Sequence, residues 1–492
     1  MKLSVCLLAS EAAPLSKTGG LADVSSALTK HLHDAGHDVR LFTPWYRSIG
    51  AWPPAQPLEG LQELPLQVGP HSYVFSVART ALPGSDAPVL LIDCPFLYDR
   101  PAIYTTDADE HLRFLAFTRA VLVSLQLMRW APQIVHCNDW HTGFAPLYLK
   151  ALYGQDTVLA RSRSVLTIHN VGYQGIFDAK HSPDLGLGSN LALLYQPDLH
   201  AGRINALRHG ILFADMITTV SPTHAREICT DEYGMGLQDS LRARSSVLHG
   251  VLNGVDYSVW DPRIDRYLPQ HYSADRLAVK AALKRELVER LKLEVGSRTA
   301  LGGIVSRLAS QKGIELLAEA LPRVLEQRNF AFVALGAGEE RYENLLSKLA
   351  RDFPGRVVFR HGYDDELAHW IEAACDLFIM PSLYEPSGLN QMYSLRYGTV
   401  PVVRRTGGLA DSVEQYDPSS GAGTGVLFDD FKAEALEAAL NAALDLHARP
   451  LHWSRLIANG MSRDFSWEHQ GGLYVELYQK LLASPAVGAP TI

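Results

Sequence analysis

The chain has 492 residues, a formal net charge of −8, and 47% hydrophobic against 20% charged residues. This length exceeds the roughly 250–300 residues at which a single hydrophobic core stops growing, so two domains are expected. The negative balance, without a block of Lys and Arg, argues against non-specific binding of nucleic acid or anionic membrane. A neutral or small anionic ligand fits this composition better.

The five cysteines are scattered and form no CxxC pair. They predict neither a disulfide framework nor a zinc site, and a reducing cytoplasm is the expected location. The start, MKLSVCLLASEAAP, has a short apolar run that leads directly into SKTGG, so we interpret it as a strand before a loop rather than as a secretory signal. No stretch approaches the ~20 apolar residues of a membrane span.

Short apolar runs alternate with helical patterns along the chain, as in a parallel sheet covered by helices. In the first half, strands are predicted at residues 3–10, 38–44, 88–94, 133–139, 164–170 and 216–221. In the second half, they are predicted at 300–308, 330–336, 356–362, 376–382 and 400–405. The runs are rich in Val, Ile and Leu, as expected for strands buried on both faces. The sequence therefore predicts an α/β protein with two Rossmann-like, doubly wound domains.

The domain boundary is expected near LHGVLNGVDYSVWDPRID, where a strand-like run ends at the turn dipeptide Asn253-Gly254. We predict an N-terminal domain over 1–252 and a C-terminal domain over 253–470. Residues 471–492 are predicted to form a C-terminal helix and tail. Periodicity leaves open whether that helix packs on its own domain or crosses back to the first.

Polar loops follow several predicted strands of the first half. Ligands of doubly wound sheets bind at the carboxyl ends of strands, beside helix N-termini. The loop KTGG (17–20) has glycines that allow a ligand close to the backbone and a Lys that attracts phosphate. Asp139 in HCNDWHTG and His169 in TIHNVGYQG offer polar groups for sugar hydroxyls. Taken alone, each loop is also compatible with a purely structural role.

The second half has similar loops. SRLASQKG (306–313) places Arg307 and Lys312 where a guanidinium and an ammonium could clamp a diphosphate. Glu385 in MPSLYEPSGL follows another strand and stands beside a predicted helix N-terminus. RRTGGLADSV (404–413) nearly repeats SKTGGLADV (16–24), so we interpret the two as equivalent strand-to-helix corners, one per domain, that meet across a deep cleft. Chance similarity of two common loop compositions is the alternative.

Missing motifs argue against several other activities. The chain lacks the GxxxxGK[ST] spacing of a P-loop and the GxGxxG of a dinucleotide fingerprint, which removes the best support for an ATPase or a dehydrogenase. It also lacks HExxH-type metal spacing and the GxSxG elbow of serine hydrolases. We therefore predict no metal site and no cofactor.

As an ordered set, the motifs closely resemble those of bacterial glycogen synthases and plant starch synthases, retaining glucosyltransferases with two Rossmann-like domains of the GT-B type. The motifs that carry the resemblance are KTGGLADV, NDWHTG, TIHNVGYQG, VLNGVD, SRLASQKG, EPSGL and TGGLADSV, and they span essentially the whole chain. The resemblance implies transfer of glucose from ADP-glucose to the non-reducing end of an α-1,4-glucan such as glycogen, with retention of the anomeric configuration.

By this resemblance, five residues carry catalysis: Glu385, Arg307, Lys312, His169 and Asp139. Arg307 and Lys312 match the family's phosphate-binding pair and would stabilise the departing diphosphate without a metal. Glu385 matches the acidic residue beside the donor glucose. Because we find no convincing pair of carboxylates to flank the bond, we favour same-face substitution over a covalent glycosyl intermediate.

The resemblance also implies nine substrate-binding residues. Lys17 and Gly20 would bind the sugar nucleotide, with Gly20 close to the diphosphate. Asn253 matches a position that contacts glucose, as do Asp139 and His169, and Tyr363 in HGYDDE looks like the residue near adenine. The remaining five follow Glu385 or belong to the second TGG loop: Gly388, Leu389, Thr406, Gly407 and Gly408.

The chain departs from the family at Ser387, where many bacterial members have Cys, and in YDRPAIYTTD (98–107), which leaves acceptor contacts open. One alternative is a transferase that uses UDP-glucose or another acceptor. Another is a catalytically silent binding protein, which would be expected to lack one of the four charged residues Lys17, Arg307, Lys312 and Glu385. Because the predicted site residues lie on both domains, closure of the domains around the donor is expected.

Overall fold

The computed structural model describes residues 2–46 and 54–485, and the end of the predicted tail lies outside this range. The chain forms two compact units. The first comprises Met1–Val220, Ala225–Gly254 and Trp467–Ile492, and the second comprises Ser221–His224 and Val255–Ser466. Apart from Ser221–His224, the chain lies in the second unit from Val255 to Ser466 and returns to the first unit at Trp467. The sequence predicted these boundaries at 252 and 470.

The first unit is built on a ten-stranded sheet, of which the central part is parallel and ordered β12-β11-β8-β7-β1-β2-β6. The bounds of these strands are β1 Ser4–Leu8, β2 Asp38–Pro44, β6 Pro88–Asp93, β7 Ile134–Asn138, β8 Arg163–Ile168, β11 Met216–Thr219 and β12 Leu248–Gly250. All six strands predicted in this half are present. Their hydrophobic runs are buried on both faces, as parallel strands require.

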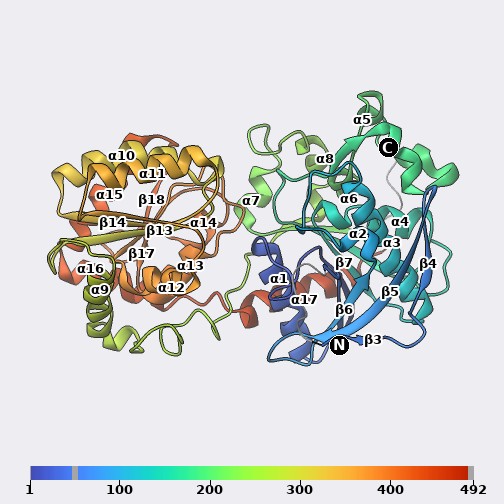
Figure 1. The fold of residues 1–492 in the computed structure, drawn as a ribbon, viewed down its shortest axis with the longest axis horizontal. Helices are drawn as coiled ribbons and strands as arrows, with labels where there is room; N and C mark the ends of the chain where they lie inside the picture. The colour runs from blue at the N-terminus through green and yellow to red at the C-terminus, as the bar shows by residue number, and fades with distance from the viewer. Residues whose placement is uncertain (1, 47–53, 486–492) are drawn as a thin grey trace. The chain divides into compact units, whose positions relative to one another are not determined.

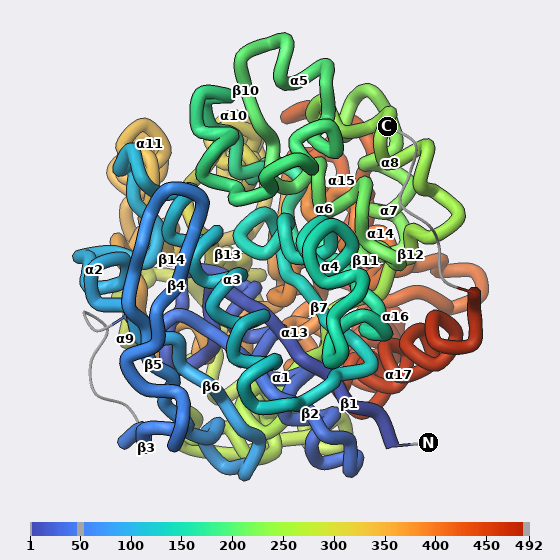
Figure 2. The backbone as a smooth tube through the Cα atoms, turned by 90° about the vertical axis from the view of Figure 1, so that its right-hand side faces the viewer, coloured from blue at the N-terminus to red at the C-terminus, as the bar shows by residue number. Residues whose placement is uncertain are grey.

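The antiparallel edge of this sheet was not predicted from the sequence. β3 (Gln56–Pro57) and β4 (Leu64–Val68) pair with β5 (His71–Ala81), which itself runs antiparallel to β6. Figure 2 shows the β4–β5 hairpin at this edge. Much of β5 alternates between buried and more exposed side chains, a pattern different from the continuous apolar runs used to find the parallel strands. β9 (Ile176–Asp178) and β10 (Arg203–Asn205) form a separate two-stranded sheet that was also missed.

Helices cover both faces of the first sheet. α1 (Gly20–Asp34) and α17 (Trp467–Ala483) pack together on one face (Figure 1). α3 (Glu110–Leu127), α4 (Ala145–Ala151) and α6 (Ala206–Phe213) contribute to the core on the other. The buried phenol of Tyr478 in α17 lies 2.7 Å from Nδ1 of His136 in β7. The C-terminal helix is therefore part of the core of the first unit.

The second unit has a six-stranded parallel sheet in the order β15-β14-β13-β16-β17-β18. The bounds are β13 Ala300–Val305, β14 Phe330–Gly336, β15 Val357–His361, β16 Leu377–Met380, β17 Val400–Arg404 and β18 Val426–Phe428. The five predicted strands are present, and β18 was missed. Numbered along the chain, the order is 3-2-1-4-5-6, that of the Rossmann fold.

The helices of the second unit also form two layers (Figure 1). α10 (Ile314–Gln327), α11 (Glu340–Asp352) and α15 (Ala433–His447) pack on one face of the sheet. α9 (Ala278–Arg290) and α12 (Asp365–Ala374) pack on the other. Two buried clusters, one per face, therefore stabilise this unit.

The remaining α-helices are mostly short: α2 Pro95–Tyr98, α5 Gln196–His200, α7 Pro222–Glu227, α8 Gln238–Ala243, α13 Asn390–Tyr397, α14 Gly407–Ser412 and α16 Pro450–Met461. Short 3₁₀ segments occur as well, among them η3 (Ala179–Leu185). Among residues 2–46 and 54–485, no helix combines the length and the apolar character needed to cross a membrane.

Candidate active site

Both sheets bring their predicted loops to the same place in the strand order. In the first unit, the polar loops follow β1, β7 and β8, which are adjacent strands. In the second, they follow β13, β16 and β17, which are also adjacent. In the Rossmann order 3-2-1-4-5-6, these strands hold positions 1, 4 and 5 of each sheet. Strands 1 and 4 flank the point where the direction of winding reverses. Ligands of such sheets bind outside the carboxyl ends of the strands at that point.

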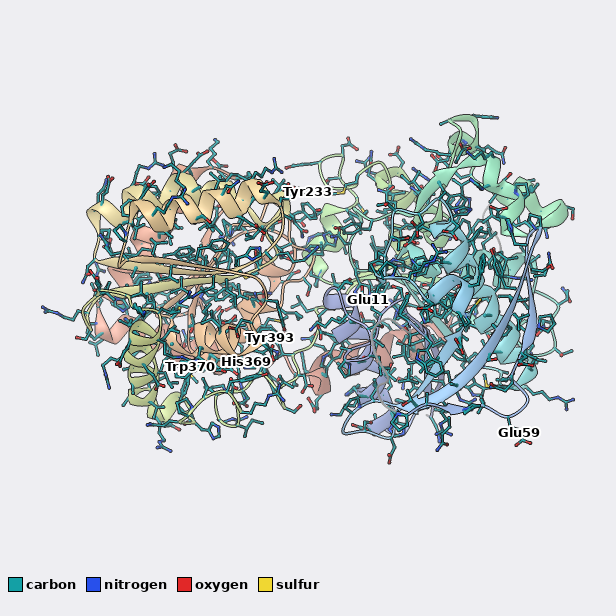
Figure 3. All side chains as sticks on the ribbon, viewed as in Figure 1. Glu11, Glu59, Tyr233, His369, Trp370 and Tyr393 are labelled. Carbon is teal, nitrogen blue, oxygen red and sulfur yellow. The ribbon has the colours of Figure 1, made fainter. Side chains whose placement is uncertain are left out.

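The KTGG loop after β1 is held by Glu11, which sequence analysis did not select. Glu11 is only 2% exposed and lies beside the start of α1 (Figure 3). Its carboxylate accepts hydrogen bonds from the backbone N–H and the hydroxyl of Thr18, the latter at 2.8 Å, and from the N–H of Gly19 at 3.3 Å. A buried carboxylate therefore fixes the loop, and its only signal in the sequence is an acidic residue directly after a buried strand.

The side chain of Lys17 and the two glycines lie at the surface of the first unit. Lys17 Nζ lies 2.8 Å from Oδ1 of Asp23, one turn into α1. A Cβ added to Gly19 or to Gly20 would meet no atom within 4 Å, and neither glycine has positive φ. The fold therefore does not require glycine at either position.

Asp139 and His169 lie together at the ends of β7 and β8. Oδ1 of the buried Asp139 accepts the backbone N–H of His169 at 2.7 Å and that of Asn170 at 3.5 Å. Asp139 has φ 54° and ψ −170°, a conformation that is strained for any residue except glycine. Strain of this kind persists only where the surroundings enforce it, and it is concentrated at functional sites.

The tautomer of His169 follows from its neighbours. The side-chain amide of Asn138 donates to the carbonyl of Leu8 at 3.0 Å, so its oxygen faces Nε2 of His169 at 2.9 Å. Nε2 must therefore donate, and Nδ1 is left as an acceptor. Burial lowers the pKa of His169 to about 3, so the ring is neutral at physiological pH. Burial raises the pKa of Asp139 to about 7, although the N–H groups of His169 and Asn170 oppose this rise.

Tyr104 connects the KTGG loop to the loop after β7. Its hydroxyl hydrogen-bonds to Glu11 and lies 2.8 Å from the hydroxyl of Ser10, and its ring stacks on His141 with centroids 4.8 Å apart. Tyr104 belongs to YDRPAIYTTD, the segment that departs from the family pattern. The structure thus places this segment among the candidate site residues, where sequence analysis assigned it no role.

Asn253 lies apart from the other candidates of the first unit. It follows β12, an edge strand that is separated from β8 by β11. The side chain is 5% exposed, and Oδ1 is buried without a hydrogen-bond partner among the described residues. The next residue, Gly254, packs so closely on Trp467 that a Cβ would lie 2.6 Å from the indole.

In the second unit, Lys312 and Glu385 form an ion pair. Lys312 Nζ lies 2.6 Å from Oε2 of Glu385, and the same oxygen accepts the hydroxyl of Ser382 at 3.0 Å. Glu385 is 5% exposed, whereas Arg307 on the same loop as Lys312 is exposed to solvent. The structure therefore brings Lys312 and Glu385 together and leaves Arg307 exposed on the loop that also holds Lys312.

The loops after β16 and β17 pack tightly on each other. The N–H of Gly408 donates to the carbonyl of Glu385 at 2.9 Å, and a Cβ on Gly408 would lie 2.0 Å from the carbonyl oxygen of Ser387. The other predicted binding residues of these loops begin the two helices that follow: Gly388 (φ +66°) and Leu389 precede α13, and Thr406 and Gly407 begin α14. Two helix N-termini therefore lie next to Glu385.

Tyr363 follows β15, the edge strand at the third position of the sheet. Its ring is 80% exposed, and its hydroxyl donates to Oδ1 of Asp365 at 3.0 Å. An exposed aromatic ring at the end of a strand can stack on a flat, uncharged ligand group. Two strands, β14 and β13, lie between β15 and β16, the strand before Glu385.

The two TGGLAD loops do not occupy equivalent corners, contrary to our interpretation of the sequence. Both follow a strand and open a helix, but β1 holds the first position of its sheet and β17 the fifth. Their aspartates also differ, because Asp23 pairs with Lys17 whereas Asp411 accepts the N–H of Thr223 at 2.7 Å. The counterpart of KTGG in the second unit is the loop of Arg307 and Lys312, so the repeat reflects similar composition rather than a duplicated corner.

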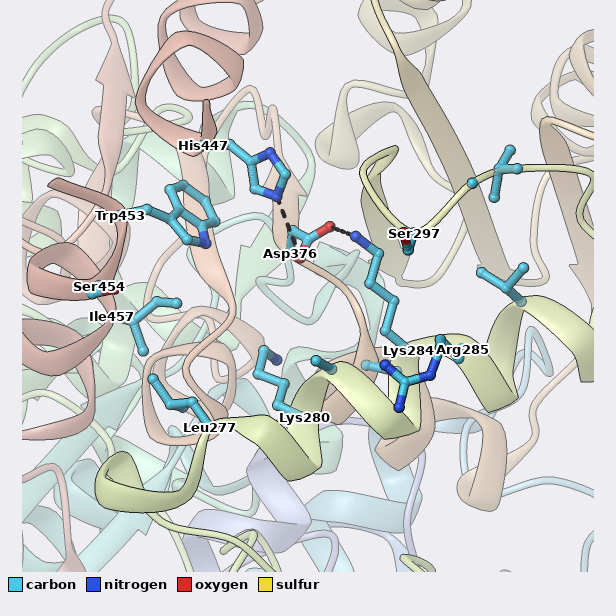
Figure 4. A pocket seen from close by; sticks show the side chains of 15 residues that line it. Leu277, Lys280, Lys284, Arg285, Ser297, Asp376, His447, Trp453, Ser454 and Ile457 are labelled. Atoms are coloured by element: carbon cyan, nitrogen blue, oxygen red, sulfur yellow. Dashed lines mark hydrogen bonds and ion pairs between the residues drawn. The ribbon is translucent and has the colours of Figure 1, made fainter. Parts of the chain in front are cut away.

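A cavity of about 490 Å³ in the second unit lies at the opposite end of the sheet (Figure 4). Asp376, which lines it, directly precedes β16 and therefore marks the amino end of that strand. Its carboxylate pairs with Lys284 and lies 3.7 Å from Nε2 of His447. Because the candidate loops follow the carboxyl ends of the strands, this cavity at the amino end of β16 is not part of the candidate site.

Comparisons with known proteins agree with this geometry. Residues 4–243 match the family model described as "Starch synthase catalytic domain", and residues 290–459 match "Glycosyl transferases group 1". Glycogen synthase from Anaeromyxobacter dehalogenans (strain 2CP-C) is 43% identical over 97% of this chain and 100% of its own length. Glycogen synthase from Thermotoga maritima is 40% identical over 98% and 99%.

Among solved structures, the catalytic domain of starch synthase IV from Arabidopsis thaliana, bound to ADP and acarbose, superposes with a TM-score of 0.89. It is 33% identical, and the match covers 98% of this chain and all of that one. Sequence relatives and structure therefore agree over both units. The chain belongs to the family of bacterial glycogen synthases and starch synthases, hexosyltransferases with the two-domain GT-B fold.

Proposed function

We propose that the protein is a glycogen synthase that transfers glucose from ADP-glucose to the non-reducing end of an α-1,4-glucan and retains the anomeric configuration. The observation that carries this proposal is the Lys312–Glu385 pair at the carboxyl ends of β13 and β16, with the exposed Arg307 on the same loop as Lys312. Relatives of this chain carry the name glycogen synthase, and the related starch synthase was solved with ADP and acarbose.

The second unit would hold the nucleotide sugar. When the bond between the anomeric carbon and the diphosphate oxygen breaks, negative charge develops on the diphosphate and positive charge on the sugar. Lys312 and Arg307 would stabilise the diphosphate, and preorganised charges of this kind usually give the largest catalytic contribution. The N-termini of α13 and α14 add partial positive charge. Tyr363 would stack on adenine.

The reaction would then proceed on one face of the sugar. The bond to the departing diphosphate breaks, the acceptor hydroxyl oxygen bonds to the anomeric carbon from the same side, and its proton passes to the diphosphate. Glu385 would orient the donor glucose through hydrogen bonds rather than form a covalent intermediate. Its buried position beside Ser382 and Lys312 fits this orienting role.

The first unit would bind the acceptor and the hydroxyls of the transferred glucose. Asp139 can accept hydrogen bonds from hydroxyls, and the neutral ring of His169 offers its Nδ1 as an acceptor. Lys17 and the N-terminus of α1 at Gly20 would contact the sugar nucleotide, and Asn253 would contact glucose. Because these groups and Lys312 belong to different units, the reaction requires closure around the donor, which small-angle scattering with ADP and a glucan should detect as a smaller radius of gyration.

The experiment that tests the proposed donor and acceptor uses radiolabelled ADP-glucose and UDP-glucose in parallel, with glycogen as primer. We expect label in the glycogen and stoichiometric release of ADP, with much slower transfer from UDP-glucose. Faster transfer from UDP-glucose would contradict the donor assignment. Binding of ADP-glucose without any transfer would instead support a silent binding protein.

A cytoplasmic location stays a prediction from the free cysteines Cys6, Cys94, Cys137, Cys229 and Cys375.

A further inference from the structure

Three histidines surround one buried carboxylate in the first unit, away from the residues assigned above. Oδ1 of Asp184 lies 3.0 Å from Nε2 of His71. Oδ2 of Asp184 lies 3.0 Å from Nε2 of His111 and 3.0 Å from Nδ1 of His181. Asp184 is 5% exposed and His111 is similarly buried, whereas His71 and His181 are partly open to solvent.

The four side chains come from three separate parts of the first unit. His71 begins β5, His111 lies in the first turn of α3, and His181 and Asp184 belong to η3. Their convergence is enforced by backbone packing. A Cβ on Gly69, which has φ +54°, would lie 2.3 Å from the carbonyl oxygen of Pro183 and 2.6 Å from Cα of Asp184. Only glycine therefore allows the β4–β5 turn to approach η3 this closely.

The spacing of the donor atoms suits a tetrahedral metal ion. The ligand atoms of His111, His181 and Asp184 all lie within 4.8 Å of one another, and three nitrogens stand 3.0 Å from the carboxylate. Four ligands bound to Zn²⁺ at about 2.0–2.1 Å lie about 3.3 Å apart at the corners of a tetrahedron. The ligand atoms of His111, His181 and Asp184 are therefore close enough to share one ion, while His71 holds the other carboxylate oxygen of Asp184.

We propose that His111, His181 and Asp184 form a binding site for one zinc ion. Two imidazoles and one carboxylate are ligands that zinc accepts, and a water molecule would complete its tetrahedral coordination. His71 would hold the other oxygen of Asp184 by a hydrogen bond. Without zinc, each ring presents an N–H to Asp184. When zinc binds, the neutral rings of His111 and His181 carry their protons on the other nitrogen and turn their lone pairs toward the metal. The exposed edges of His71 and His181 provide a path for the ion.

The bound ion would join α3 to η3, and the hydrogen bond between Asp184 and His71 would link it to β5. The side chain of His111 already stacks on Phe177 in β9, with ring centroids 4.7 Å apart. Because the site ties together segments that are distant in the sequence, zinc bound to the folded chain is expected to stabilise the first unit by mass action. This inference is independent of the proposed glycosyl transfer.

The test uses the untagged full-length chain, since a polyhistidine tag would bind zinc itself. The metal-free protein is titrated with ZnCl₂, and bound zinc is measured by inductively coupled plasma mass spectrometry after dialysis. We expect one zinc per chain and a higher Tm in the presence of zinc. X-ray absorption at the zinc edge should show nitrogen and oxygen ligands at about 2.0 Å.

Two variants and one control make the result specific. His181→Gln and Asp184→Asn should weaken zinc binding by more than the about 10–100-fold that loss of an outer-shell partner costs. Both should lose the increase in Tm caused by zinc. The control His200→Gln changes an exposed histidine of the same unit and should bind zinc like the parent. Circular dichroism without metal establishes that the variants fold.

Two results would overturn the proposal. One is zinc binding that is unchanged in His181→Gln and Asp184→Asn, because the metal would then sit elsewhere. The other is an intact chain that takes up no zinc at concentrations that saturate a reference zinc-finger peptide. In that case the three histidines would serve only as hydrogen-bond donors to Asp184.

Discussion

The ammonium of Lys312 lies 2.6 Å from the buried carboxylate of Glu385, so the cation assigned to the departing phosphate is paired with the acid assigned to the donor sugar. A diphosphate that binds here must share or take over this ammonium. Donor binding and the position of Glu385 are therefore coupled through one hydrogen-bonded pair.

Removal of either phosphate-binding cation should lower turnover. We expect Lys312→Ala and Arg307→Ala each to lower kcat about 10²-fold or more, because each removes a charge that stabilises the departing diphosphate. Arg351→Ala, which changes an exposed arginine on α11, is the matched control and should be near normal. Initial rates of ADP release measure the effect. A near-normal kcat for both active-site variants would contradict their role.

Glu385 is expected to form no covalent bond with glucose. Glu385→Gln keeps the shape of the side chain but leaves Lys312 without its anionic partner, so kcat should fall while the fold is retained. Intact-protein mass spectrometry after rapid quenching, with ADP-glucose and no acceptor, should show only the unmodified mass. A glucosyl adduct that disappears in Glu385→Gln would replace same-face substitution by a double displacement.

Two glycines of the TGG loops should respond differently to substitution by alanine. Gly20→Ala should leave Tm unchanged, since its Cβ would meet no atom within 4 Å, but raise KM for ADP-glucose because the methyl group enters the space proposed for the diphosphate. Gly408→Ala should lower Tm, since its Cβ would lie 2.0 Å from the carbonyl oxygen of Ser387. Differential scanning calorimetry and steady-state kinetics separate the two effects. A normal KM for Gly20→Ala would remove Gly20 from the donor site.

We expect kcat/KM of the enzyme to depend on pH through the ionisation of Asp139. Its pKa is raised to about 7, so the ionised form that accepts hydrogen bonds increases as pH rises through that value. We therefore expect kcat/KM to rise over about two pH units around 7 and then level off. Asp139→Asn should lower kcat/KM and abolish the rise. His169, with a pKa lowered to about 3, should contribute nothing to the profile in this range.

Asp376 is expected to stabilise the second unit until the pH becomes strongly acidic. Burial raises the pKa of its carboxyl, but the nearby imidazole of His447 and the charge of Lys284 outweigh burial and lower the pKa to about 2, from an ordinary value of 3.8. A lowered pKa stabilises the folded state above the unfolded value. This stabilisation of about 2 kcal/mol is lost as pH falls from about 4 through about 2.

The variant Asp376→Asn tests this prediction. It should lose about 2 kcal/mol of unfolding free energy at neutral pH and show a weaker decrease of stability with acid. Asp352→Asn, in an exposed pair with Lys348, is the control and should change stability by about 0.5 kcal/mol or less. Urea unfolding at several pH values gives both numbers. Parallel pH curves for the parent and Asp376→Asn would show that Asp376 does not titrate as stated.

The sequence was sufficient to predict every parallel strand with a long apolar run and the loops that follow them. Such strands are marked by local composition, and the switch-point rule then places their loops at one edge. Glu11 and Tyr104 could not be predicted this way, because their roles depend on hydrogen bonds that form only when the chain folds. The β4–β5 hairpin was missed because exposed edge strands lack continuous apolar runs.

The histidine cluster shows the same limit in a stronger form. His71 and Asp184 are separated by 113 residues, and nothing in their local sequence relates them. The close packing of Gly69 on the backbone of η3 helps to bring them together. Motifs with a fixed residue spacing detect metal sites whose ligands lie on one loop or helix. They miss sites whose ligands come from separate elements of the fold.

The packing of α17 on the first sheet has a consequence for biosynthesis. Trp467, Tyr474 and Tyr478 are buried in the same cluster as Val5 and Leu41. On the ribosome, the strands of the first unit emerge early, but this cluster stays incomplete until Val255–Ser466 has been translated, which takes on the order of tens of seconds at about 5–20 residues per second. During that time an apolar face of the nascent chain stays uncovered and open to chaperones. The first half of the polypeptide therefore finishes folding only after the second has been made.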